Sequence, residues 1–147
     1  LISANGLEEL HHFTTANSPL PSNHILAIAV QPNSGEVFIG TDHGTVGYRG
    51  TATYAFSTPD PDIHVFPNPV RPDYSGPIAV RGFTRDALVH IVDIAGHVVY
   101  TTKSQGGQAI WNGLSSSGHR VSSGTYYVFA SDTDGQNRSV AKILIVR

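Results

Sequence analysis

Apolar residues in the first third of the chain come in short runs that are separated by turn-forming residues. The turn signals are Asn33-Ser34-Gly35 and Asp42-His43-Gly44, and no run is long enough for an ordinary helix. The pattern predicts four short strands, at residues 10–14, 25–31, 36–41 and 45–49. Apolar side chains fall on both faces of such a sheet, so it needs cover from neighbouring structure.

A polar stretch separates this part from the rest of the chain. Residues 57–62, with the sequence Ser-Thr-Pro-Asp-Pro-Asp, contain no apolar residue and two prolines that cannot donate ladder hydrogen bonds. We therefore expect a domain at 1–56, a linker at 57–62 and a second domain at 63–147.

Seven strands are predicted in the second domain. They lie at residues 63–66, 77–83, 87–94, 98–104, 108–111, 124–131 and 139–146. Turn signals recur at a spacing close to the 8–12 residues typical of a two-sheet sandwich. In the last strand Ile143 and Ile145 oppose Leu144 and Val146, so we expect a strand that is apolar on both faces and central or covered.

Composition excludes several classes of function. The nine Lys and Arg residues are scattered and the net charge is −2, which argues against nucleic acid as a partner. The absence of Cys excludes disulfides and thiolate chemistry, and no apolar run approaches the roughly 20 residues of a transmembrane segment. The sequence lacks Met and begins at Leu1, so we expect a processed chain or a fragment.

No pattern of catalytic or metal-binding residues emerges. The eight His residues include no helical pair and no HExxH motif. The Asp132-Thr133-Asp134-Gly135 stretch lacks the Glu of a calcium loop and predicts a hairpin turn. Serines flank His119 at 115–117 and 122–123, but only their proximity in sequence supports a nucleophile. We expect no enzyme activity, no cofactor and no metal.

Several short motifs in the first domain resemble one repeat family. Leu20-Pro21-Ser22-Asn23, Phe38-Ile39-Gly40-Thr41, Gly44 and Tyr48 resemble the two-component-regulator propeller repeat, in which Trp is usual at the position of Phe38. The resemblance implies that residues 1–56 are a terminal β-propeller blade. Its uncovered faces and edges are expected to pack on a second copy of the chain or on the second domain.

Motifs in the second domain resemble immunoglobulin-like modules. Residues 89–99, with Trp111-Asn112-Gly113, resemble the domain of flagellar-hook capping proteins. Pro67-Asn68-Pro69, Ser123-Gly124-Thr125-Tyr126 and the basic-aliphatic ending at Lys142 are even more similar to the C-terminal sorting domains of type IX secretion in Bacteroidetes. The implied fold class is all-β: a partial propeller blade followed by a seven-stranded immunoglobulin-like β-sandwich.

These motif residues also have structural interpretations. The resemblance implies a sorting or docking motif made of Pro67, Asn68, Pro69, Ser123, Gly124, Tyr126 and Lys142. Asn68 between two prolines suits a point where strand pairing stops. We expect Trp111 to fill the core, and Tyr126 to pack its ring while its hydroxyl reaches a nearby carbonyl.

A blade followed by a sorting-type sandwich resembles the propeller-containing component of the type IX secretion attachment complex. This resemblance implies delivery through the periplasm to the outer-membrane surface. It also implies binding to secretion-machinery or sortase-complex proteins and to anionic lipopolysaccharide, without a chemical reaction. Two alternatives remain open: the periplasmic sensor region of a hybrid histidine kinase, and the sorting tail of a secreted hydrolase.

Overall fold

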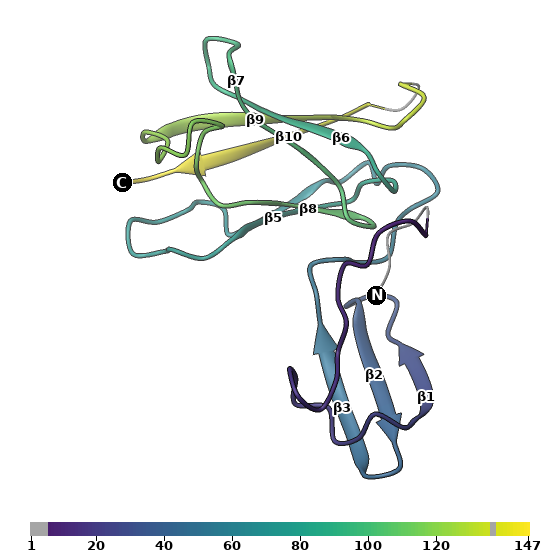
Figure 1. The fold of residues 1–147 in the computed structure, drawn as a ribbon. Coiled ribbons are helices and arrows are strands. Elements are labelled where there is room, and N and C mark those ends of the chain that lie inside the picture. Colours follow the sequence, from purple (N-terminus) through teal and green to yellow (C-terminus); the bar gives the residue numbers. More distant parts are fainter. Residues whose placement is uncertain (1–5, 136–137) are drawn as a thin grey trace. The chain divides into compact units, whose positions relative to one another are not determined.

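The computed structural model describes residues 6–135 and 138–147, and this part of the chain is all-β without a helix, as predicted. The strands form three antiparallel sheets (Figure 1). They belong to two compact units, Leu1–Gly50 and Thr51–Arg147, which are called here the three-stranded unit and the two-sheet unit.

The three-stranded unit is a meander of adjacent antiparallel strands. Its strands are β1 (Ile25–Val30), β2 (Glu36–Thr41) and β3 (Gly44–Arg49), paired in the order β1-β2-β3. The turns lie where Gly35 and Gly44 were expected to allow them, and both glycines have positive φ angles of 71° and 133°.

The predicted strand at 10–14 is wrong, because side-chain hydrogen bonds hold this stretch in an irregular conformation. The Asn17 side chain accepts a hydrogen bond from the Thr14 N–H at 2.7 Å and donates one to the His12 carbonyl at 2.7 Å. Such local bonds compete with strand ladders for backbone groups. The irregular segment nevertheless has a packing role.

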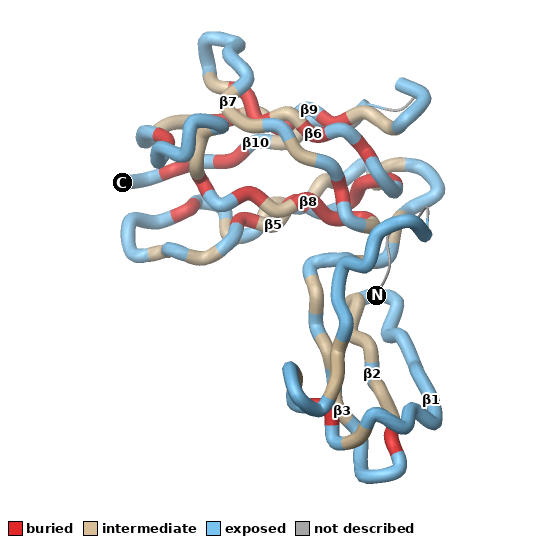
Figure 2. The backbone as a smooth tube through the Cα atoms, in the orientation of Figure 1, coloured by how far each residue is buried: buried red, intermediate tan, exposed pale blue. Residues whose placement is uncertain are grey.

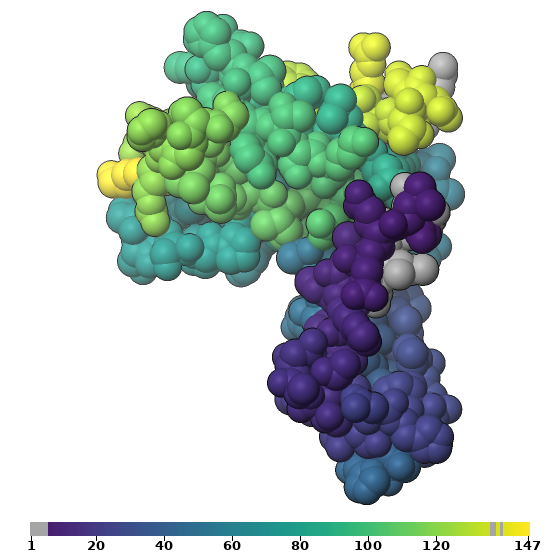
Figure 3. Space-filling view, in the orientation of Figure 1, coloured from purple at the N-terminus to yellow at the C-terminus, as the bar shows by residue number. Residues whose placement is uncertain are grey.

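This N-terminal segment covers part of one face of the sheet (Figure 3). The ring of Phe13 lies 4.8 Å from that of Tyr48, and Leu20 is buried. Strand β1 stays exposed along its whole length, with Ile28 65% and Val30 60% accessible. Cover for this apolar strand, by a second copy of the chain or by the second domain, therefore stays a prediction.

The two-sheet unit contains the seven remaining strands. One sheet has the order β4-β5-β8 and the other the order β10-β9-β6-β7. The strands are β4 (His64–Phe66), β5 (Ile78–Arg81), β6 (Leu88–Val92), β7 (Val98–Lys103), β8 (Gln108–Trp111), β9 (Gly124–Ser131) and β10 (Arg138–Ile145).

The inner faces of these two sheets share one hydrophobic core (Figure 2). Val80 of one sheet and Val89, Val128 and Ile143 of the other are at most 1% exposed. Burial of each such side chain contributes about 1.5–3 kcal/mol. The alternation of buried and exposed positions along β9 is the two-residue period that the sequence shows.

Trp111 fills the centre of this core, as expected. It is 1% exposed, and its ring centroid lies 5.6 Å from that of Tyr126. The indole N–H donates to the Leu114 carbonyl at 2.7 Å, so the one polar atom of the side chain is satisfied.

A segment expected to belong to the first domain and the linker pairs with the two-sheet unit instead. This segment, residues 51–60, is called the strap. Thr53 bridges Gly106, Phe56 bridges Thr84, and the Asp60 N–H donates to the Gly82 carbonyl at 2.8 Å. The boundary between the units therefore lies at Gly50 and Thr51, before the polar stretch rather than within it.

The strap can approach the sheet this closely because glycines lie beneath it. A Cβ atom on Gly106 would lie 1.7 Å from the Thr53 carbonyl oxygen, and one on Gly107 would lie 2.1 Å from that of Tyr54. Both distances are far below a van der Waals contact. The two glycines thus accommodate a neighbouring backbone, in addition to forming a turn before β8.

Candidate docking site around the C-terminal strand

The predicted motif residue Asn68 binds the backbone of β10 directly. Its side-chain amide donates to the Lys142 carbonyl at 2.9 Å, and its side-chain oxygen accepts the Leu144 N–H at 2.9 Å. An asparagine side chain carries both a donor and an acceptor, so it can imitate one residue of a neighbouring strand. Asn68 therefore occupies part of the outer edge of β10.

Val70 extends this pairing with backbone groups. Its N–H donates to the Leu144 carbonyl at 2.8 Å, and its carbonyl accepts the Val146 N–H at 2.8 Å. Val70 is buried, which anchors the segment to the core. We call Asn68 and Val70 the edge clamp.

The two prolines of the motif lie where the chain changes sheets. Strand β4 ends at Phe66, and two residues later Asn68 is bound to β10 of the opposite sheet. Pro67 and Pro69 have no N–H to continue the β4 ladder. The expectation that this motif ends strand pairing is consistent with that position, although the structure adds a second role in covering β10.

The other part of the motif lies beside the end of β10. The Ser123 hydroxyl oxygen accepts the Arg147 N–H at 2.9 Å, and Gly124 is the register partner of Ile145. The Arg147 side chain donates from Nε to the Val121 carbonyl at 2.8 Å. These contacts attach the end of the chain to the start of β9.

Tyr126 joins this region to the core. Its hydroxyl donates to the Ser122 carbonyl at 2.9 Å, which confirms the expected link to a nearby carbonyl. Burial raises the pKa of the Tyr126 phenol, and the negative charge of Asp93 raises it further. The hydroxyl therefore stays protonated and keeps its role as a donor.

Lys142 lies on β10 itself and points to the outer face of the sheet. Its Nζ atom is 5.8 Å from the ring centroid of Tyr127, the residue paired with it on β9. This is within the range of a cation–π contact. All seven predicted motif residues are thus placed on β10 or on the segments that flank it.

The expectation of a last strand covered on both faces is wrong. Ile143 and Ile145 are buried, whereas Leu144 is 43% exposed and Val146 is 40% exposed. The reason is the two-layer arrangement, because only the inner face of this sheet meets the other sheet; β10 also lies at the edge of its sheet. The outer face of β10 is therefore open to a partner.

Val70 and Arg147 contribute to this site but were not among the predicted residues. Val70 directly follows Pro69, and its role depends on a backbone pairing that the residue type does not reveal. Arg147 ends the chain, and its basic side chain gives no indication that it binds a carbonyl.

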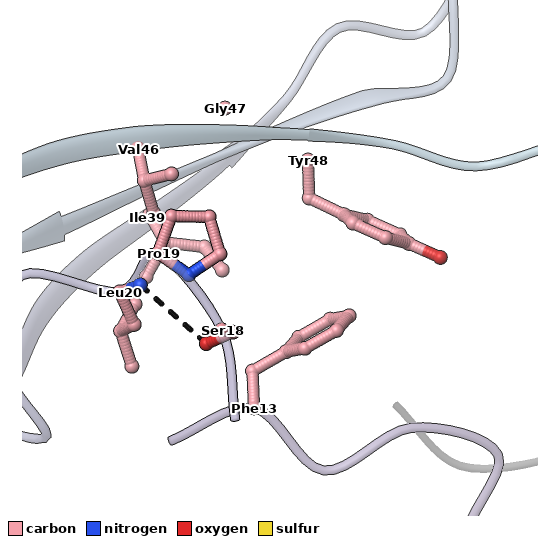
Figure 4. A pocket seen from close by; sticks show the side chains of 8 residues that line it. All are labelled: Phe13, Ser18, Pro19, Leu20, Ile39, Val46, Gly47 and Tyr48. Atoms are coloured by element: carbon pink, nitrogen blue, oxygen red, sulfur yellow. Dashed lines mark hydrogen bonds between the residues drawn. The ribbon is translucent and has the colours of Figure 1, made fainter. Parts of the chain in front are cut away.

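The three-stranded unit contains a small apolar pocket (Figure 4). Its walls include Phe13, Leu20, Ile39 and Tyr48, and its volume is about 60 Å³. Sites for small molecules typically measure about 300–1,000 Å³. The pocket is therefore a packing gap under the N-terminal segment rather than a candidate ligand site.

The serines near His119 do lie together. Ser115 Oγ is 2.8 Å from Ser117 Oγ, which is 3.1 Å from His119 Nδ1. Ser117 and His119 are exposed, and hydrogen bonds within a turn account for this arrangement. Within residues 6–135 and 138–147, no group of three His, Asp or Glu side chains is arranged to hold a metal ion.

The part of the chain that the structure describes includes no helix of the length and hydropathy needed to cross a membrane.

The edge clamp can be tested by removing its side-chain bonds. We expect Asn68→Ala to lower the free energy of unfolding by about 1–2 kcal/mol, because two hydrogen bonds to β10 are lost. Amide hydrogen exchange should become faster at Leu144, whose N–H loses its acceptor. Asn23→Ala, which removes two side-chain bonds in the three-stranded unit, serves as the control. Unchanged exchange at Leu144 would contradict the assignment.

No protein-family model matches the sequence, and the search of curated proteins gives no match. Among solved structures, the chain is similar to PorZ, an essential bacterial surface component of the type IX secretion system of Porphyromonas gingivalis. The two are 30% identical with a TM-score of 0.66, over 99% of this chain and 20% of PorZ. The chain is also similar to dimeric latent PorU from Porphyromonas gingivalis, with 22% identity and a TM-score of 0.43, over 76% of this chain and 12% of PorU.

The similarity to PorZ includes both units, because it extends over nearly the whole chain. The chain spans about a fifth of the length of PorZ. This similarity supports the relation to a PorZ-like type IX secretion component that the sequence motifs indicate.

Proposed function

We propose that this chain is the C-terminal part of a PorZ-like component of a type IX secretion system. In this proposal the three-stranded unit is a terminal propeller blade, and the two-sheet unit is an immunoglobulin-like domain of the C-terminal sorting type. The observation that carries the proposal is the similarity to PorZ across both units, at 30% identity and a TM-score of 0.66.

The proposed role is recognition without a chemical step. The two-sheet unit directs the protein through the secretion machinery to the outer-membrane surface, where the protein binds partner subunits of the sortase complex and anionic lipopolysaccharide. The placement of all seven motif residues around β10 supports this role, since a rigid, well-packed strand with one exposed face can dock a partner.

The proposal is tested by deleting the two-sheet unit from the intact protein. The deletion should begin at Thr51 rather than Ile63, because the strap is paired with this unit and would otherwise be left without its partner strands. We expect the deleted protein to remain in the periplasm, as measured by labelling intact cells with a membrane-impermeant biotin reagent.

Two controls make the result interpretable. Total protein is measured by immunoblot to exclude degradation, and a substitution at an exposed residue of the three-stranded unit, Val30→Ser, should leave delivery unchanged. Surface labelling of the deleted protein at the level of the intact protein would remove the proposed function.

A further inference from the structure

The edge clamp covers only half of β10. Asn68 and Val70 bind backbone groups of Lys142, Leu144 and Val146, which all point away from β9. Because backbone direction alternates along a strand, the N–H and carbonyl of Val140 and the N–H of Lys142 point to the same side. These groups have no backbone partner among the residues that the structure describes.

An unpaired edge of this kind is a template for another strand. Val140 is 58% exposed, and its register partner on β9, Phe129, is 44% exposed. An added strand would therefore gain backbone hydrogen bonds along β10 and apolar contact on the outer face of the sheet.

Two cations flank the open part of the edge. Arg138 and Lys142 lie two residues to either side of Val140, on the same face of the strand. A second copy of β10 paired antiparallel about Val140 would place Arg138 opposite Lys142 at both ends. Like charges directly opposite each other destabilise a strand pair, so these residues disfavour a second copy and favour an acidic segment.

The surface beside this edge also combines a cation with apolar side chains. A shallow depression of about 510 Å³ is lined by Arg138, His90, Phe129 and Val140, and its described lining contains no carboxylate. A second depression shares Ser131 and Gly135 with the first, but its lining combines Lys103 with acidic residues: Asp86, Asp132 and Asp134. Arg138 is thus the one charged residue in the described lining of the depression next to the open edge.

We propose that β10, between Arg138 and Lys142, accepts an extended acidic segment of a partner protein as an additional strand. Acidic side chains of that segment lie opposite Arg138 and Lys142, and an apolar side chain lies opposite Val140 and packs against Phe129. This inference deepens the proposed function, because it names the surface and the chemistry by which the two-sheet unit recognises a protein partner.

The test uses the whole 147-residue chain and a synthetic peptide with the sequence Thr-Glu-Thr-Val-Thr-Glu-Thr, blocked at both ends. Binding is followed by amide chemical shifts in a titration of the isotope-labelled chain. We expect shifts centred on Val140 and Lys142, and slower amide exchange at these two residues. A peptide with Lys in place of both Glu residues should have an affinity that is lower by a factor of roughly ten or more.

Three variants locate the interaction. Arg138→Glu with Lys142→Glu should reverse the preference between the two peptides. Val140→Pro should abolish binding of the acidic peptide, because it removes an N–H on the open side, where an edge strand tolerates proline. Lys103→Glu is the matched control and should leave binding unchanged, since Lys103 lies on the edge strand at the opposite side of the sheet.

Unaltered shifts at Ile143 show that Val140→Pro is folded, and the charge-reversal variant tests the same surface without touching the backbone. Equal binding of both peptides, shifts elsewhere than 138–142, or dimer formation that Val140→Pro abolishes would each overturn the inference. If the acidic peptide does not bind but deletion of the two-sheet unit abolishes surface delivery, the edge site is wrong and the proposed function stands. If the acidic peptide binds as expected but the deletion variant is still delivered to the surface, the proposed function is wrong and the edge site stands.

Discussion

Trp111→Ala is expected to lower the free energy of unfolding of the two-sheet unit by about 3–5 kcal/mol. The side chain is almost completely buried between the two sheets and packs against the ring of Tyr126. Truncation leaves a cavity that the surrounding strands cannot fill, and it also leaves the Leu114 carbonyl without its donor.

The measurement is chemical denaturation followed by far-ultraviolet circular dichroism, because Trp111 is the only Trp and its removal abolishes the usual fluorescence signal. Phe129→Ala is the matched control: it also removes an aromatic ring, but one that is 44% exposed on the outer face. We expect a cost of less than about 1 kcal/mol for the control. Equal costs for the two variants would show that Trp111 is not the centre of the core.

Alternation of apolar and polar residues was sufficient to locate most strands in the sequence. The strands at 108–111 and 124–131 have the same bounds in the structure as in the prediction. Alternation reports which side chains face the core, and in β9 the inward residues Tyr126, Val128 and Ala130 are all buried. The sequence of a strand with one buried face therefore indicates which of its residues face the core.

The same reasoning could not give the order of the strands. Ile143, Leu144, Ile145 and Val146 are all apolar, so the sequence indicates a strand buried on both faces. In the structure the strand is at an edge, and the face with Leu144 stays exposed. Hydrophobicity alone does not distinguish a face buried within the unit from a face kept for a partner.

Long-range contacts of single side chains also could not be predicted from the sequence. The residue type of Asn68 and its two proline neighbours indicated a point where pairing stops, which suits its place in the structure. Its binding partners on β10, however, are 74 and 76 residues away. No spacing rule connects positions that far apart, because their contact depends on how the two sheets pack.

Glycines illustrate a different limit. The sequence Gln105-Gly106-Gly107 by itself indicates a turn, since glycine most often marks a turn when it interrupts a β pattern. The structure shows that these glycines also leave room for the backbone of Thr53 and Tyr54. A second reason for glycine, the close approach of another segment, becomes visible only when that segment is in place.

This second reason leads to a strong expected effect for Gly106→Ala. The φ angle of Gly106 is +65°, which alone costs about 1–2 kcal/mol for a residue with a side chain. In addition, the new methyl group would overlap the Thr53 carbonyl, so the strap must detach or the sheet must shift. We expect a total loss of about 3–5 kcal/mol in the free energy of unfolding, at the upper end of single substitutions.

Gly118→Ala separates the two contributions. Gly118 also has a positive φ, +82°, but no atom lies within 4 Å of the position of its new methyl group. Chemical denaturation should therefore show a loss of only about 1–2 kcal/mol for this control. Limited proteolysis should cut within residues 51–60 much faster in Gly106→Ala than in Gly118→Ala, because only the first displaces the strap. If the two variants lose the same stability and are cut at the same rate, the strap does not lie against Gly106 in solution, and the two-sheet unit begins after it.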